Sequence, residues 1–339
     1  MPRAAAAADA HEKWRLLGER FRIGSPIAVL ETVDRRIAYP AWKEVAGLLP
    51  ELAVSSQAAP RAAAPGSKDE RLQNTRFYDD FGWVEGAEGV FNDALAFEDM
   101  RPVTSFYRKR CHRRVNRHLT GGRYLLDCAS GPVQIPEYVS YSEGFEKRIC
   151  VDLSFAGLLK AKERLGEHAI CIVGDITALP LRDGCADNFI SAHTVYHVPA
   201  AEQAKAVAEL HRVLARGGTG VIVYSWGSAS PIFRASEKLR AWLERRGWLR
   251  PPAGVPRLKT DLGLYFHAHD YGWYRREIEG PYAARLRVWR SVHKEFLEWF
   301  ARGEASARLL LWPLYAAEEL MPRLFGRYGI SPMFVLRKD

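Results

Sequence analysis

The sequence predicts an α/β fold built on a doubly wound, mostly parallel sheet. Apolar stretches of strand length recur at residues 124–126, 149–151, 170–173, 189–192 and 221–224. Segments in which apolar residues have helical spacing separate these stretches. Strands that alternate with helices along a chain typically form a parallel sheet with helices on both faces.

Two of the intervening helices can be recognised from their boundaries. Ser154 can cap a helix whose apolar residues, Leu158 among them, share one face and which ends at Gly166. A second helix is expected over residues 201–214, just before a pair of glycines. Open parallel sheets bind ligands beyond the carboxyl ends of their strands, so the site is expected at those ends.

The remainder of the chain is expected to add segments to this core. Linker-like composition at residues 53–68 separates a small N-terminal appendage from a helical lead-in that is rich in aromatic and basic residues. A long aromatic insertion follows the fifth strand. The expected division is an appendage (1–52), a linker (53–68), a helical lead-in (69–120), the core (121–227), the insertion (228–283) and a C-terminal part of the core with strands six and seven, at 285–289 and 333–336.

Composition limits the classes of partner. The 339 residues carry a formal net charge of +9, which favours an anionic partner such as a phosphorylated or carboxylated small molecule. Lysine and arginine are scattered rather than gathered in one patch, which disfavours nucleic acid without excluding it.

The spacing of the cysteines and the hydropathy of the chain indicate in which cellular compartment the protein is expected. The five cysteines stand singly and form no C-x-x-C pair, so the sequence predicts neither a zinc site nor a disulfide framework. No run approaches the roughly 18 apolar residues that a membrane span needs. We therefore expect a cytoplasmic protein with no membrane partner.

Residues that could bind a ligand or take part in catalysis follow four of the predicted strands. The first strand ends in Leu-Asp-Cys-Ala-Ser-Gly-Pro, residues 126–132, whose small residues let a ligand approach the backbone. Asp152 ends the second strand, where an acidic side chain can accept both hydroxyls of a ribose. Gly174-Asp175-Ile176 ends the third, and the fourth runs into residues 191–197, which contain two histidines.

This order resembles the class I S-adenosylmethionine-dependent methyltransferases, in particular the group with an L-D-x-A-x-G first turn. The resemblance covers residues 124–226 and implies a seven-stranded sheet whose last strand is antiparallel, with S-adenosylmethionine as cofactor and S-adenosylhomocysteine as product. It also implies the cofactor contacts: Asp127, Ala129, Ser130 and Gly131 for the methionine portion, Asp152 with Leu153 for the ribose, Asp175 and Ile176 for the adenine, and His193 and Thr194 on the cofactor's other side.

One residue departs from the family pattern. Where the family usually has a third glycine in the first turn, this sequence has Val133. A nicotinamide dinucleotide site also uses a glycine-rich turn and an acid on the second strand, but the full G-x-G-x-x-G is absent here. The methyltransferase is therefore the favoured interpretation.

Methyl transfer from a sulfonium is an in-line displacement, so the protein has to align the reactants and exclude water. Where the acceptor needs a base, His193 and His197 are the candidates, with core packing as the alternative for His197. We expect a lid with substrate contacts from Tyr78, Tyr107, Tyr265 and His267, although ordinary packing also explains each tyrosine. No metal is expected, because His267 and His269 lack a recognisable third ligand.

The sequence thus predicts a methyltransferase that acts on an oxygen or nitrogen of a small molecule, such as a secondary metabolite or a sugar-containing intermediate in biosynthesis. Two alternatives stay open. One is an RNA or protein methyltransferase, supported by the net charge and the arginine clusters. The other is a non-catalytic module that binds the cofactor without turnover, which Val133 permits. A homodimer is also open.

Overall fold

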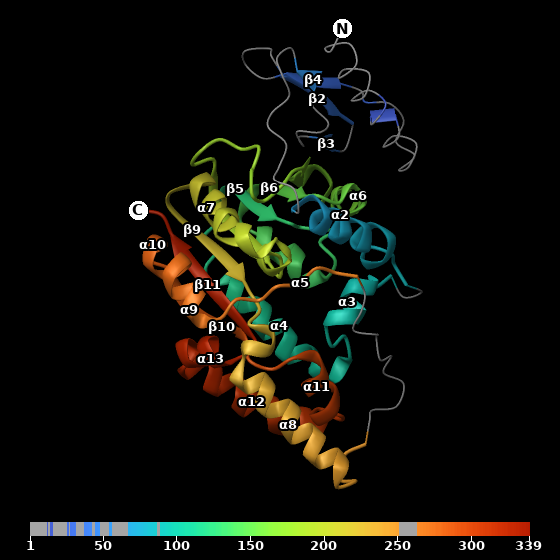
Figure 1. The fold of residues 1–339 in the computed structure, drawn as a ribbon, viewed down its shortest axis with the longest axis vertical. Coiled ribbons are helices and arrows are strands. Elements are labelled where there is room, and N and C mark those ends of the chain that lie inside the picture. The colour runs from blue at the N-terminus through green and yellow to red at the C-terminus, as the bar shows by residue number, and fades with distance from the viewer. Residues whose placement is uncertain are drawn as a thin grey trace.

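The structure is a computed structural model, and it describes residues 12, 14, 15, 26, 28–31, 37–42, 45–47, 54–55, 67–86, 89–250 and 263–339. A twisted sheet runs through the molecule and is flanked by helices, while the N-terminal strands lie at one end (Figure 1). The α/β fold class expected from the sequence is confirmed.

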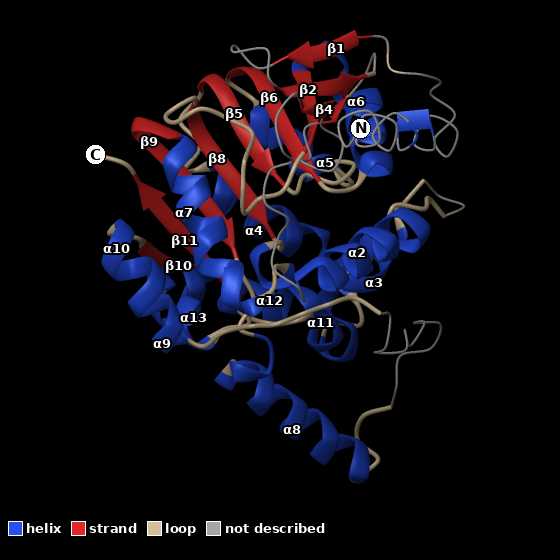
Figure 2. Ribbon diagram, turned by 45° about the horizontal axis from the view of Figure 1, so that its top comes forward, coloured by secondary structure: helices blue, strands red, loops and turns tan. Residues whose placement is uncertain are grey.

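Seven strands make up the core of the sheet, in the order β7-β6-β5-β8-β9-β11-β10. Their bounds are β5 (Gly122–Cys128), β6 (Phe145–Asp152), β7 (Ala169–Val173), β8 (Ala186–Ala192), β9 (Leu214–Val223), β10 (Arg285–Arg290) and β11 (Ser331–Arg337). Strands β5 to β9 pair in parallel, and β11 lies antiparallel between β9 and β10. The last strand is therefore antiparallel, as the resemblance implied (Figure 2).

Short N-terminal strands extend the sheet beyond β7. They are β1 (Ala28–Glu31), β2 (Ile37–Ala41), β3 (Ala46–Gly47) and β4 (Val54–Ser55), and β3 pairs in parallel with β7. The Trp42 ring meets Phe155 edge-on, with 5.2 Å between ring centroids. Most of the linker expected at 53–68 lies outside the described residues.

A helical lead-in precedes β5. It comprises α2 (Ser67–Phe77), the π-helical turn η2 (Tyr78–Gly82), α3 (Asn92–Phe97) and α4 (Ser105–Asn116). Within the core, α5 (Pro136–Val139), α6 (Phe155–Leu165) and α7 (Gln203–Val213) connect the strands. The predicted cap of α6 is present: Ser154 Oγ accepts a hydrogen bond from the Gly157 amide at 2.9 Å, and Gly166 ends the helix at φ 57°.

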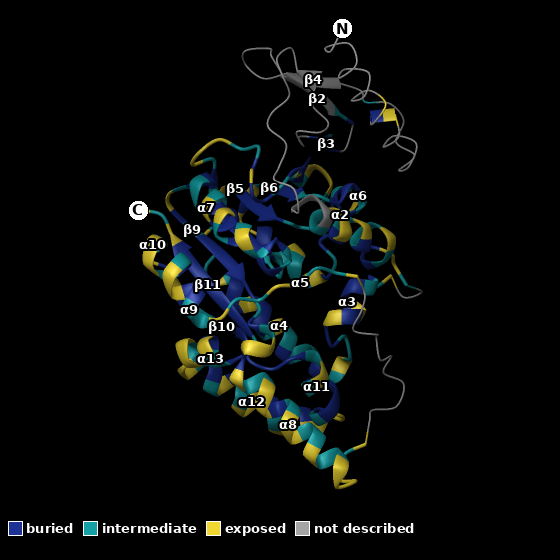
Figure 3. Cartoon of the chain, in the orientation of Figure 1, coloured by how far each residue is buried: buried dark blue, intermediate teal, exposed yellow. Residues whose placement is uncertain are grey.

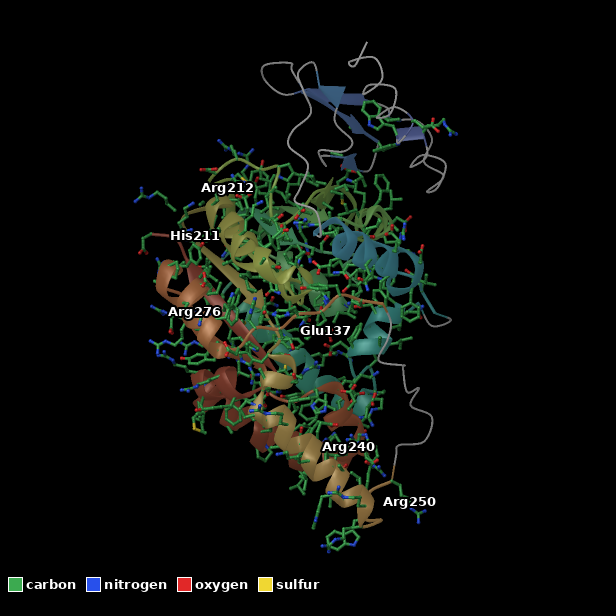
Figure 4. The ribbon with its side chains drawn as sticks, viewed as in Figure 1. Glu137, His211, Arg212, Arg240, Arg250 and Arg276 are labelled. Atoms are coloured by element: carbon green, nitrogen blue, oxygen red, sulfur yellow. The ribbon has the colours of Figure 1, made fainter. Side chains whose placement is uncertain are left out.

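The segments after β9 complete the fold. Helices α8 (Pro231–Arg245), α9 (Tyr271–Trp273) and α10 (Gly280–Tyr282), with the π-helical η9 (Tyr274–Glu279), precede β10. Helices α11 (Lys294–Phe300), α12 (Glu304–Leu320) and α13 (Pro322–Tyr328) lie between β10 and β11. Arg240 and Arg250 mark the end of the molecule farthest from the N-terminal strands (Figure 4). No helix among the described residues is long and apolar enough to cross a membrane.

Both faces of the sheet are buried, as the colouring in Figure 3 shows. One face packs against α7 and η9 through residues such as Val207, Leu210 and Tyr274. The other packs against α4 and α12 through residues such as Cys111 and Leu311. Strands buried on both faces read as continuous apolar runs, which is why their positions could be predicted.

Candidate active site

A cavity of about 600 Å³ lies at the carboxyl ends of β5, β6, β7 and β8. The strand ends form its floor, while α2, η2, α3 and the start of α11 supply further walls. The volume falls within the range of roughly 300–1,000 Å³ that is typical of small-molecule sites. The cavity therefore lies where the topology of an open parallel sheet predicts a ligand site.

The first turn, after β5, alternates left-handed residues. Ala129, Gly131 and Val133 have φ values of 58°, 49° and 53°. A Cβ on Gly131 would lie 2.6 Å from the Trp83 ring, so glycine is required there. Val133 adopts the left-handed conformation that glycine would take, at a strain of about 1–3 kcal/mol. The residue that departs from the family pattern thus has a backbone conformation that glycine adopts more readily than valine.

Asp152 connects this turn to α6. Its Oδ2 accepts a hydrogen bond from the Gly131 amide at 2.8 Å, and its Oδ1 accepts one from the Ser154 amide at 2.7 Å. Burial raises the pKa of Asp152 to about 6, although both amides oppose the shift. Asp152 and its neighbour Leu153 line the cavity. Because each carboxylate oxygen has two lone pairs, Asp152 can still accept hydrogen bonds from a ligand.

Asp127 lies away from the cavity lining. Its Oδ2 accepts hydrogen bonds from Arg148 Nε at 3.0 Å and Arg148 Nη2 at 2.5 Å, and both side chains are buried. Arg148 also donates to the Tyr138 carbonyl at 2.7 Å. Asp127 thus holds β5 to β6 and to α5 beneath the first turn, whose Ala129 and Ser130 do line the cavity.

Asp175, at the end of β7, is engaged by the lead-in helix α2. Arg71 Nε lies 2.9 Å from Asp175 Oδ2, and Asp175 Oδ1 accepts from the Thr177 amide at 2.8 Å. Asp175 and Ile176 line the cavity with Thr194, which follows β8. These three residues predicted to contact the cofactor thus line the same cavity, although β6 and β5 separate β7 from β8 in the sheet.

The two candidate bases both line the cavity and are both neutral at physiological pH. Burial lowers the pKa of His193 to about 3 and that of His197 to about 4. His193 has a left-handed backbone at φ 60°, and its buried Nε2 makes no hydrogen bond within the described part of the chain. His197 Nδ1 lies 2.7 Å from the Tyr265 carbonyl oxygen. That contact requires the proton on Nδ1, which leaves Nε2 with its lone pair.

The four residues predicted to contact the substrate lie in different places relative to the cavity. Tyr78 lines the cavity and stacks on Trp83, with 4.6 Å between ring centroids. Tyr107 is fully buried elsewhere, and its hydroxyl donates to Glu318 at 2.7 Å. Tyr265 is outside the lining, where its hydroxyl accepts from the Ala200 amide at 3.1 Å.

His267 is also outside the lining. Its backbone binds the Tyr196 carbonyl and the Gln203 side chain. The insertion instead reaches the cavity through Leu264 and Phe266. Among the residues that the structure describes, no cluster of three side chains could hold a metal ion.

Several lining residues were missed by sequence reasoning. They are Arg71 and Trp83 of the lead-in, Asp93 in α3, Glu98 directly after α3, and Arg290 at the end of β10. One signal could have found Asp93, because it is a carboxylate on the apolar face of a helix with Ala94 and Ala96. Arg290 is buried and forms a bidentate pair with Glu98, at 2.7 and 3.2 Å.

A comparison with protein-family models matches the core of the chain. A family model described as a methyltransferase domain matches residues 126–222. No curated protein sequence matches the chain.

Solved structures with a similar arrangement include the following three proteins. Phosphoethanolamine N-methyltransferase 1 of Haemonchus contortus, in complex with phosphoethanolamine and S-adenosylhomocysteine, is 11% identical, with 80% of this chain and 50% of that chain covered and a TM-score of 0.49. The PH0226 protein of Pyrococcus horikoshii is 14% identical, with 73% and 96% covered and a TM-score of 0.44. A putative methyltransferase of Bacillus halodurans is 16% identical, with 67% and 98% covered and a TM-score of 0.40.

The family model and the strand order agree. The matched residues begin in β5 and end in β9, and they contain the first turn, Asp152, Asp175 and both candidate bases. The strand order β7-β6-β5-β8-β9-β11-β10, with β11 antiparallel, is the seven-stranded arrangement that the resemblance implied. Residues 126–222 of this chain therefore match a methyltransferase domain, and the core has the fold of the class I S-adenosylmethionine-dependent methyltransferases that it resembles.

Proposed function

We propose that this chain binds S-adenosylmethionine and transfers its methyl group to an oxygen or nitrogen of a small molecule. The observation that carries the proposal is the cavity of about 600 Å³, which has the family's cofactor motifs on its floor and the lead-in over them. A secondary metabolite or a sugar-containing intermediate is the proposed class of acceptor, and S-adenosylhomocysteine is the product.

Individual contacts follow from the lining. Asp152 would accept the ribose hydroxyls, and the turn at Ala129 and Ser130 would hold the methionine portion. Asp175 and Ile176 would contact the adenine. Asp127 would act indirectly, because its carboxylate is bound to Arg148 under the turn.

Methyl transfer at this site would mainly require that the acceptor atom and the methyl group are aligned. The cofactor supplies an activated methyl group, and the residues around it orient the acceptor and exclude water. His193 and His197 are both neutral, so either can accept a proton from an acceptor hydroxyl or amine. Both lone pairs are thus free between pH 5 and 8, but pKa values of about 3 and 4 make both imidazoles weak bases.

A small acceptor is favoured over a macromolecule by the cover on the cavity. The lead-in at 69–120 contributes Arg71, Tyr78, Trp83 and Asp93 to the walls, and the insertion at 228–283 contributes Leu264 and Phe266. We propose that these two segments are the substrate-capping parts of a cytoplasmic enzyme, with 1–52 as an appendage. An RNA or protein acceptor is supported by the net charge of +9 and by the arginine clusters, such as the one at residues 108–114.

Calorimetric titration with S-adenosylmethionine and S-adenosylhomocysteine tests the proposal. Saturable binding is expected, and Asp152→Asn should weaken it by about tenfold or more, because a carboxylate–hydroxyl hydrogen bond contributes about 1.5–3 kcal/mol. Asp183→Asn is the matched control, because Asp183 is 79% exposed and bound to Arg212 outside the cavity lining. Absence of binding at millimolar ligand would contradict the proposal, and binding without turnover of any acceptor would favour the non-catalytic module.

A further inference from the structure

Asp93 is one of the carboxylates of the cavity that the proposed cofactor contacts leave unused. It lies on α3, is 9% exposed and lines the cavity. Its Oδ2 accepts one hydrogen bond, from Gln134 Nε2 at 2.8 Å. Within the described part of the chain, no lysine, arginine or backbone amide binds it, whereas Glu98 has Arg290 and Asp175 has Arg71. A buried carboxylate without a cation is costly, and a cationic ligand would offset that cost.

Three tyrosine rings line the same cavity as this carboxylate. Asp93 is among the charges that raise the pKa values of Tyr78, Tyr138 and Tyr196, after the larger effect of burial. All three tyrosines line the cavity. Tyr196 is 8% exposed, and its hydroxyl makes no hydrogen bond among the described residues. The faces of such rings attract cations, most strongly where water is excluded.

The same end of the cavity adjoins the cofactor floor. Tyr78 lines the cavity together with Asp152 and Asp93, and both carboxylates add to the effect of burial in raising its pKa. Tyr78 in turn stacks on Trp83, whose ring lies against Gly131 of the first turn. The indole Nε1 of Trp83 is buried and has no hydrogen-bond partner in the described structure. A group held at Asp93 therefore lies beside the floor on which the cofactor is proposed to bind.

The charges that line the cavity are mainly negative. Five carboxylates line it, namely Asp93, Glu98, Asp152, Asp175 and Glu295, against the three cations Arg71, Arg290 and Lys294. Each of those cations is already engaged: Arg71 with Asp175, Arg290 with Glu98, and Lys294 with Glu298 at 3.4 Å. The cavity thus has the opposite sign to the chain's net charge of +9, which had favoured an anionic partner.

We propose that the α3 end of the cavity, formed by Asp93, Tyr78, Tyr138 and Tyr196, binds the acceptor as an amine, with Asp93 as its counter-ion and proton acceptor. This inference rests on the proposed function and narrows its acceptor to nitrogen. The ammonium gives one proton to Asp93, and the nitrogen lone pair then forms a bond to the methyl carbon. The carbon–sulfur bond breaks and its electron pair stays on sulfur, so the products are a methylated ammonium and the thioether.

The test compares three probes that differ only in their polar end: phenethylamine, 2-phenylethanol and 3-phenylpropionate. Each is titrated into the full chain saturated with S-adenosylhomocysteine. Phenethylamine should bind about tenfold or more tightly than the alcohol, because a charged hydrogen bond contributes about 1.5–3 kcal/mol, and the carboxylate should bind most weakly. Asp93→Asn should abolish the preference for the amine, and Asp183→Asn should retain it.

Each contrary outcome has a defined meaning. Equal binding of amine and alcohol, tighter binding of the carboxylate, no binding of phenethylamine, or an amine preference that survives Asp93→Asn would each overturn the inference. Retained affinity of Asp93→Asn for S-adenosylhomocysteine shows that the variant is folded. If the parent chain binds S-adenosylhomocysteine but not the amine, the inference fails while the proposed function stands. If S-adenosylhomocysteine itself does not bind, the proposed function fails.

Discussion

Arg71 Nε lies 2.9 Å from Asp175 Oδ2, and this ion pair joins α2 to the end of β7 across the cavity. The same guanidinium donates to Glu202 at 2.5 Å and to Thr177 Oγ1 at 2.9 Å. One turn later, the Asn74 side chain binds the His197 carbonyl and the Tyr265 amide, both at 2.8 Å. Helix α2 is therefore tied to the third and fourth strand ends and to the insertion.

Replacing Arg71 should loosen this cover. Arg71→Met leaves Asp175 and Glu202, which are 20% and 24% exposed, without their shared cation. We expect a loss of about 1–3 kcal/mol in the free energy of unfolding, measured by urea denaturation, and weaker binding of S-adenosylhomocysteine. Arg123→Met is the control, because Arg123 and Glu146 are both largely exposed, and its change should stay within about 0.5 kcal/mol. Equal urea midpoints for the two variants would contradict the anchoring role.

Asp152 should make cofactor affinity depend on pH. Its pKa of about 6 means that the carboxylate becomes protonated as the pH falls through that value. If the ionised form accepts the ribose hydroxyls, the dissociation constant for S-adenosylhomocysteine should rise about tenfold per pH unit below 6. His193 and His197 stay neutral over this range and add no slope. Calorimetry between pH 5 and 8 checks this; a slope that persists in Asp152→Asn would assign it to another group.

Asp93 should lower stability at neutral and alkaline pH. Burial raises its pKa from 3.8 to about 6, so its contribution to stability is full below pH 3.8 and is lost as the pH rises through 6. Asp93→Asn should therefore raise the free energy of unfolding at pH 8 by up to about 3 kcal/mol, and the gain should fall by roughly half at pH 5. Urea denaturation at both values measures it, with Asp183→Asn as the control. A variant that is destabilised equally at both pH values would show that Asp93 is a structural residue.

The two histidines of the site should not titrate near neutrality. Burial lowers their pKa values to about 3 and 4, so the imidazole resonances of His193 and His197 should keep their chemical shifts between pH 5 and 8. Nuclear magnetic resonance with labelled histidine measures this, and His193→Gln and His197→Gln assign the signals. A shift with a midpoint between 6 and 7 for either residue would mean that its ring is hydrated in solution.

The residues at the ends of the core strands could be predicted because the sequence pattern that marks each strand is local. Strands buried on both faces leave continuous apolar runs, and the residues that end them, Asp152 and Asp175, follow directly in the sequence. Val133 could be recognised as a departure from the family pattern, but its left-handed φ of 53° could not be predicted, because valine rarely adopts it.

The walls that the lead-in and the insertion contribute to the cavity could not be predicted, because they depend on contacts between segments that are distant in the sequence. Arg71 reaches Asp175 from a different part of the chain, and no periodicity encodes that partner. Tyr107 is expected to contact the substrate from the aromatic lead-in, yet its hydroxyl binds Glu318 of α12. Tyr265 and Phe266 are neighbours in an irregular segment, and only the fold determines that Phe266 lines the cavity.

The strain at Val133 predicts an unusual response to glycine. Val133 and Val221 are both fully buried, but Val221 lies in β9, whereas Val133 has a φ of 53°. Each change to glycine removes the same buried side chain and adds the same freedom to the unfolded chain, at a cost of about 2–4 kcal/mol. At Val133 the substitution also releases about 1–3 kcal/mol of backbone strain. Val133→Gly should therefore be less destabilising than Val221→Gly by about that amount in urea denaturation, and it should retain binding of S-adenosylhomocysteine. Equal losses of stability would mean that the packing around Val133 accommodates the left-handed backbone without strain.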